Sequence, residues 1–221
     1  MMRILLQKEV DRLKKKIIQL STLVEESVYK SVKSIAERDY KLAEQVIRDD
    51  AEVDQMEVEV EEDCLKVLAL HQPVAVDLRF IIAVLKMNND LERIGDLALN
   101  IAEGSKFLCS QPVVSVPFDF PAMSQKVQTM LRLSVDSLIN TDEKTAQSVL
   151  EMDDEIDEIH RDMYRQVSEE LQKNPKSVDC LIRLLSVSRN LERIADHTTN
   201  IAEDIIYMIT GEIVRHQSAL L

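Results

Sequence analysis

The chain has 221 residues but only 3 Gly and 5 Pro, so few turns can form and long helices are expected between them. Its 27 Lys and Arg against 40 Asp and Glu give a formal charge of −13, which argues against direct binding to nucleic acid because no basic patch is segregated. The three cysteines have no paired spacing, and no stretch approaches the roughly 18 apolar residues of a membrane span. We therefore expect a cytoplasmic protein without membrane insertion.

Three helices are predicted in the first half of the chain. The first runs to about Glu37 and carries apolar residues at helical spacing on one face, namely Leu13, Ile17, Leu20, Val24, Val28 and Ile35. The second runs from about Tyr40 to His71. A turn follows at residues 72–77, because Pro73 is tolerated at the start of a helix but not in its interior. The third helix continues to about Leu108.

A proline-rich segment divides the chain. Residues 109–121 hold three of the five prolines and show no helical period, which indicates an interdomain linker. Three further helices are predicted after it: residues 122–140, residues 141–173, and a last helix that follows a turn at Asn174 and Pro175 and ends at Gly211.

The second half repeats the first. Residues 90–103, "DLERIGDLALNIAE", and residues 190–203, "NLERIADHTTNIAE", are identical at nine of fourteen positions. Residues 43–55 likewise match residues 146–158, so the repeat offset is 103 in one helix and 100 in the next. The predicted fold is all-α, with two tandem, pseudo-symmetric antiparallel three-helix bundles at residues 1–108 and 122–221.

Acidic residues four apart recur on the helices that flank the first turn. Asp50 and Asp54 lie on one face of the second helix, and Glu92 and Asp96 on one face of the third. Residue 73 lies halfway between Asp54 and Glu92. It also lies halfway between Asp50 and Asp96, so an antiparallel hairpin brings all four carboxylates to one level.

The same arrangement recurs in the second half. Asp153 and Asp157 precede the turn, and Glu192 and Asp196 follow it, with both halfway points between residues 174 and 175. Two carboxylates about 6 Å apart repel by about 3 kcal/mol at an effective dielectric near 20, so four of them favour a bound cation. Oxygen ligands suit Mg²⁺, Ca²⁺ or Mn²⁺, and carboxylate-rich sites also accept iron. The alternative is a metal-free helical interaction module whose acids only keep it soluble.

Amide and imidazole side chains flank these acids. Asn100 and Asn200 each follow the last acid of a cluster by one turn and are further candidate ligands. His160 follows Asp157 by three residues, and since its first-half counterpart is Glu57, the two sites would differ if it ligates. His197 is expected to face solvent. A di-iron oxidase needs paired Glu-x-x-His motifs, which are missing, and we find no glycine-rich phosphate loop or nucleophile with a base, so no enzyme is predicted.

The segments "QPVAVDLR", "DLERIGDLALNIAE" and "RNLERIADHTTNIAED" resemble the PhoU family of phosphate-uptake regulators over nearly the whole chain. The resemblance implies a cytoplasmic and often dimeric protein in which Glu/Asp-x-x-x-Asp motifs hold multinuclear metal clusters. The ions would be divalent or trivalent, with iron, Mn, Mg, Ca and Zn all compatible. The motifs map onto the acids at positions 50, 54, 92 and 96, and at 153, 157, 192 and 196.

The resemblance also implies a function without turnover. Members of the family regulate the phosphate response negatively, through the ATPase of the phosphate importer and through a membrane sensor histidine kinase. The second half departs from the pattern at its turn, where "KNPKSVDC" stands in place of "QPVAVDLR". Any role of Asp77 and Arg79 therefore belongs to the first bundle alone.

Overall fold

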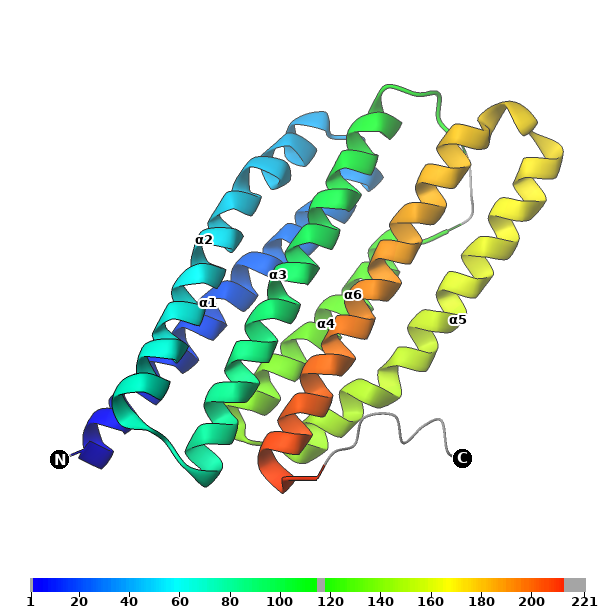
Figure 1. Cartoon of the computed structure of the whole chain (residues 1–221). Coiled ribbons are helices and arrows are strands. Elements are labelled where there is room, and N and C mark those ends of the chain that lie inside the picture. Colours follow the sequence, from blue (N-terminus) through cyan, green and yellow to red (C-terminus); the bar gives the residue numbers. More distant parts are fainter. Residues whose placement is uncertain (1, 115–117, 213–221) are drawn as a thin grey trace.

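Six long α-helices and one short 3-10 helix make up the computed structural model, which describes residues 2–114 and 118–212 (Figure 1). In these ranges there is no β-strand, and no helix combines the length and apolar content needed to cross a bilayer. The elements are α1 (Met2–Glu37), α2 (Tyr40–His71), α3 (Ala75–Cys109), α4 (Phe120–Asn140), α5 (Glu143–Lys173), η1 (Pro175–Ser177) and α6 (Val178–Thr210). The predicted all-α fold is confirmed.

Local sequence explains where the helices begin and end. The carboxylate of Asp39 caps α2 by accepting hydrogen bonds from the first backbone amides of the helix, and Asp142, 103 positions later, caps α5 in the same way. Gln72 ends α2 in the left-handed conformation, with φ at 45°, and its backbone N–H donates to the carbonyl of Leu68. Pro73 follows directly, so the chain cannot continue as a helix and turns into α3.

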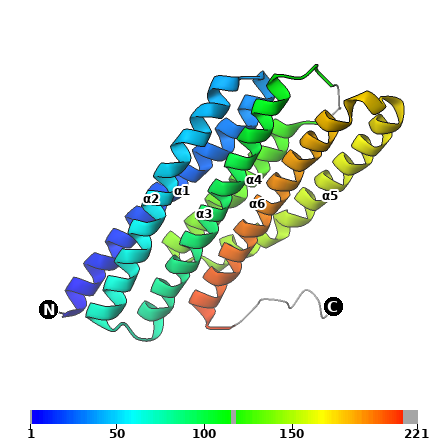
Figure 2. The same ribbon diagram turned by 45° about the horizontal axis from the view of Figure 1, so that its top comes forward.

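The helices form two layers, which both views show (Figures 1 and 2). One layer has the order α2, α3, α6 and α5, and α1 and α4 pack behind it. Each half contributes three helices, but the halves are not separate bodies, because α3 packs along α6 and α1 packs against α4. Buried apolar side chains from both halves form one continuous core. The division at residues 109–121 remains a prediction, and α3 and α4 extend one or two residues into that segment.

On α3 and α6, the acidic residues lie on the same helix face as buried apolar residues that precede them. Ile81 of α3 and Leu181 of α6 are both 0% exposed, and Leu85 and Leu185, one turn later, pack against the core. Since side chains four apart share a helix face, this stripe turns the later acids toward a neighbouring helix and not fully into solvent.

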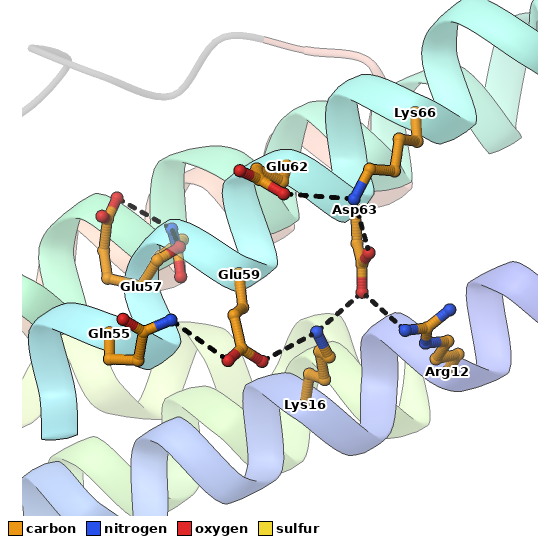
Figure 3. A network of polar contacts seen from close by, with 9 residues as sticks. Arg12, Lys16, Gln55, Glu57, Glu59, Glu62, Asp63 and Lys66 are labelled. Atoms are coloured by element: carbon orange, nitrogen blue, oxygen red, sulfur yellow. Dashed lines mark hydrogen bonds and ion pairs between the residues drawn. The ribbon is translucent and has the colours of Figure 1, made fainter.

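An ion-pair network fixes α2 against α1 (Figure 3). The side chain of Asp63 is only 10% exposed, and its Oδ2 lies 2.8 Å from Lys16 Nζ and 3.5 Å from Arg12 Nη2. Burial raises the pKa of Asp63, but the hydrogen bond and charge of Lys16, aided by Arg12, hold that pKa below the ordinary value of 3.8. Asp63 is therefore a charged contact that holds α2 against α1.

Candidate metal centres

The first cluster lies on the hairpin of α2 and α3. Asp50 is half-buried there, and burial is the main cause that raises its pKa to about 6, with further contributions from the charges of Asp54, Asp96 and Glu92. The four acids therefore act on one another electrostatically, as the repeated spacing predicts. A bound cation would remove both the repulsion and the cost of a buried negative charge.

Gly95 brings the two helices of this hairpin close together. A Cβ atom added at Gly95 would lie 3.1 Å from Val53 Cγ1 and 3.7 Å from Asp50 Oδ1. The missing side chain thus lets α2 approach α3 beside the acids. The counterpart in the second half is Ala195, which is 0% exposed, so the α5–α6 hairpin holds a methyl group at this level.

Glu92 carries a buried oxygen that forms no hydrogen bond within the described part of the chain. Its Oε2 lies 3.4 Å from Arg93 Nε, which is close enough for an ion pair but lacks hydrogen-bond geometry. Burial is the main cause of its raised pKa, followed by the charge of Asp96, while Arg93 opposes the shift. Arg93 Nη1 also donates to Asp96 Oδ2 at 3.3 Å. One arginine therefore offsets only part of the charge of four carboxylates.

The second cluster, on the hairpin of α5 and α6, repeats these properties. Burial raises the pKa of Asp153 to about 6, and the charges of Asp196 and Asp157 add to the shift. Burial also raises the pKa values of Glu192 and Asp196. Asp153 Oδ1 is buried and has no hydrogen-bond partner among the residues that the structure describes. A buried oxygen without a donor fits a cation ligand, because leaving it unsatisfied is otherwise costly.

The acids lie near one another but do not converge on a single point. Across residues 2–114 and 118–212, no three side chains of His, Cys, Asp or Glu are placed so as to hold one ion. Rotation of the carboxylates is therefore needed for ligation. The donor set fits a hard cation in charge and chemistry, and the assignment of these residues as ligands remains a prediction.

The two flanking asparagines lie at the edge of this arrangement. Asn100 and Asn200 are both exposed. Asn200 lines a cavity of about 620 Å³ between α2, α3 and α6, together with Glu57, Lys86 and Asp90. The eight carboxylates are not among the residues that line this cavity, so the two clusters are separate from it.

The two histidines have defined partners. His160 Nδ1 lies 2.9 Å from Ser188 Oγ, and burial is the main cause that lowers the pKa of His160. The expectation that His197 faces solvent is wrong, since its side chain is 19% exposed and its Nδ1 lies 2.8 Å from Asp90 Oδ1. The sequence held one signal for this pair. Asp90 and His197 both stand at positions where the other repeat has a residue of different chemistry, Asn190 and Leu97.

The family model of the PhoU domain matches twice, at residues 17–104 and 120–205, which confirms the internal duplication. The phosphate-specific transport system accessory protein PhoU homolog of Aquifex aeolicus is 38% identical over 210 residues, covering 95% of this chain and 95% of that protein. Homolog 2 from Thermotoga maritima is 33% identical and covers 98% of this chain and 93% of that protein.

Solved structures show the same architecture. The crystal structure of PhoU from Pseudomonas aeruginosa is similar with a TM-score of 0.88 at 32% identity, covering 93% of this chain and 99% of that one. The phosphate transport system regulatory protein PhoU from Streptococcus pneumoniae gives a TM-score of 0.85 at 29% identity, covering 95% of this chain and 99% of that one. With both halves matched and the whole architecture shared, the chain belongs to the PhoU family.

Proposed function

We propose that this protein is a cytoplasmic regulatory adaptor of phosphate uptake that binds metal ions and has no catalytic turnover. It restrains the phosphate importer and the phosphate-starvation response by contacting the importer's ATPase and a sensor histidine kinase. The names of the relatives, which describe phosphate transport accessory and regulatory proteins, support the phosphate role. The observation that carries the proposal is the cluster of four carboxylates, present in both halves of a PhoU-family chain.

The metal would be held by residues of one hairpin in each half. When bound, it supplies positive charge that neutralises the carboxylates, and iron, Mn, Mg, Ca and Zn all match the donor set. Asn100 and Asn200 lie one turn beyond the last acid of each cluster, and Asn200, which lines the separate cavity, would have to turn toward the acids to complete a shell. An ion that binds only the folded state stabilises that state. Metal binding would therefore make the stability of the hairpins depend on the supply of metal.

A second candidate is a metal-free interaction module. Large apolar side chains remain exposed at the turn between α2 and α3, where Leu70 is 76%, Val74 73% and Val76 62% exposed. Exposed apolar surface of this kind is typical of protein contacts and serves either candidate. We also propose that the protein forms a homodimer. The partners to test at this surface are therefore a second copy of the chain and the importer's ATPase.

The test is genetic and biochemical. Deletion of the gene in a host with a phosphate importer and its sensor kinase should derepress phosphate-starvation genes in phosphate-replete medium. The parent should restore repression, whereas the Glu92→Gln, Glu192→Gln double variant should restore it poorly. A pull-down with the parent should recover the ATPase or the kinase. Full complementation by the double variant would favour the metal-free module, and unchanged expression in the deletion strain would contradict a phosphate role.

A further inference from the structure

The cavity between α2, α3 and α6 has a strongly negative lining. Its volume is about 620 Å³, and none of the eight carboxylates of the two clusters lines it. Five other carboxylates do, against one ammonium group, so the lining has a formal charge of −4. These acids are Glu57 and Glu61 of α2, Asp90 of α3, and Glu203 and Asp204 of α6. Such a lining repels an anion such as phosphate and attracts a cation.

The duplication of the chain does not account for this charge. Four of the five acids correspond to residues of the other repeat that have no carboxylate. These counterparts are His160, Tyr164, Asn190 and Gly104. Asn89, which also lines the cavity, corresponds to Arg189, so the other repeat has a positive charge at this position. The negative cavity is therefore a feature of one half of the protein and not a consequence of the repeated fold.

Lys86 shows how the cavity receives an alkylammonium group. Its Nζ lies 2.9 Å from Asp204 Oδ1, and the side chain of Asp204 is only 5% exposed. Because Lys86 is engaged there, it leaves the negative charge on the α2 side in place. Burial is the main cause that raises the pKa of Glu57, and the charge of Glu61 adds to this shift, followed by that of Asp54. A second cation on the α2 side would relieve this repulsion.

Asn88 supplies a buried acceptor among the residues that line the cavity. Asn88 is 1% exposed, and its Nδ2 donates to the Glu57 carbonyl at 2.9 Å and to Glu57 Oε1 at 3.0 Å. Both partners of Nδ2 are acceptors, which fixes the orientation of the amide. Asn88 Oδ1 is then left without a donor within the described part of the chain. Since an unsatisfied buried acceptor is costly, a ligand here should donate hydrogen bonds.

We propose that this cavity binds a linear polyamine, a flexible chain with two or more primary ammonium groups. Each ammonium group offers three donors and no acceptor, which matches carboxylate and amide oxygens. The volume is that of a pocket for an organic ligand, and in residues 2–114 and 118–212 no three acidic, histidine or cysteine side chains meet at one point as a metal ion requires. Acids spread over three helices suit a chain with several separated charges. The inference does not depend on metal binding at the two clusters.

Calorimetric titration of the full-length, metal-stripped protein with spermidine at low ionic strength tests the proposal. Spermidine should bind saturably at one site per chain, and putrescine, with one charge fewer, more weakly. Glu61→Gln should weaken spermidine binding by about 2- to 5-fold, the effect of one exposed ion pair. Asn89→Arg, which introduces the charge of Arg189, should weaken it by about 10-fold. The matched control is Glu62→Gln, since Glu62 pairs with Lys66 at 3.1 Å and does not line the cavity.

The Glu92→Gln, Glu192→Gln double variant separates the cavity from the carboxylate clusters and should change the affinity for spermidine by less than about twofold. Loss of binding in this variant, equal losses in Glu61→Gln and Glu62→Gln, or no binding at millimolar spermidine would overturn the assignment. A tetralysine peptide that binds more tightly than spermidine, and is weakened by the same cavity variants, would assign the cavity to a basic segment of a protein partner and overturn the polyamine. Each of these results leaves the proposed metal binding to its own test.

Discussion

His197 Nδ1 of α6 lies 2.8 Å from Asp90 Oδ1 of α3, which joins the two halves of the protein by a polar contact. A second contact lies beside it, between Lys86 Nζ of α3 and Asp204 Oδ1 of α6 at 2.9 Å. Both contacts lie on the surface where α3 packs along α6. The two repeats therefore form one folded unit with a shared core.

Lys86→Met should lower the free energy of unfolding by about 2 kcal/mol, because the Asp204 side chain is only 5% exposed and loses its 2.9 Å ion pair. Calorimetry of both proteins should show a single transition. Arg165→Met is the control, since its 3.1 Å pair with Asp162 is exposed on both sides and should contribute less than about 1 kcal/mol. Two well-separated transitions in the parent would contradict the shared core.

Gly95→Val should destabilise the protein by about 1–3 kcal/mol, because even a Cβ at this position lies 3.1 Å from Val53 Cγ1 and forces α2 away from α3. The displacement should also weaken metal binding at the first cluster, since Asp50 lies beside the new side chain. Denaturant titration and metal titration check the two effects. The control is Ala195→Val in the second hairpin, which should weaken the second cluster and spare the first. Equal effects on both clusters from either variant would argue against local positioning.

Asp50→Asn should stabilise the metal-free protein at pH 7, by about 1 kcal/mol once solvent screening is allowed for. The pKa of Asp50 is raised from 3.8 to about 6, so the folded state binds more protons than the unfolded state between these values. This group therefore makes the metal-free parent more stable as pH falls from 7 toward 4, and the variant should lose that part of the pH dependence. Thermal melts in chelator from pH 4 to 8 measure it. The exposed control Asp11→Asn should leave the profile unchanged, and a lower melting temperature for Asp50→Asn at pH 7 would refute the repulsion argument.

Asp63→Asn should destabilise the protein at pH 7, in contrast to Asp50→Asn. The Asp63 pKa lies below 3.8 in the folded protein, so its ionised form contributes stability above that pH, and the contribution is lost as pH falls through the folded pKa. At pH 7 the variant should be less stable by about 2 kcal/mol, because Lys16 loses a charged partner at 2.8 Å. The difference should shrink as the pH falls below 3.8. Urea unfolding at several pH values tests this, with the exposed Glu62→Gln as a control that should change little.

Much of the fold follows from local signals in the sequence. The bounds of α2 agree with prediction because Asp39 supplies a cap and Pro73 prevents continuation. The sequence also predicts that the acidic pairs of adjacent helices lie opposite each other. In an antiparallel hairpin of two straight helices, residues at equal distances from the turn are neighbours. Helical periodicity and turn chemistry act over a few residues, which is why they are readable from one sequence.

The packing of the two halves was not predictable in this way. The contact of Asp90 with His197 joins residues 107 positions apart, and no local period encodes which faces of α3 and α6 meet. The same holds for the close approach at Gly95, which a single glycine within a helix does not reveal. The electrostatic effect of the acids on one another was predictable from spacing, whereas the side-chain rotamers of the acids depend on burial and on neighbours such as Arg93.

Elemental analysis of the full-length protein, purified without chelator, tests most directly whether the carboxylate clusters bind metal. The parent should carry metal at both clusters. Glu92→Gln and Glu192→Gln should each lose the metal of one hairpin and keep that of the other, and the double variant should lose nearly all of it. A parent that carries no metal and takes none up when iron, Mn²⁺, Mg²⁺, Ca²⁺ or Zn²⁺ is supplied, or a double variant that binds as much as the parent, would contradict the account.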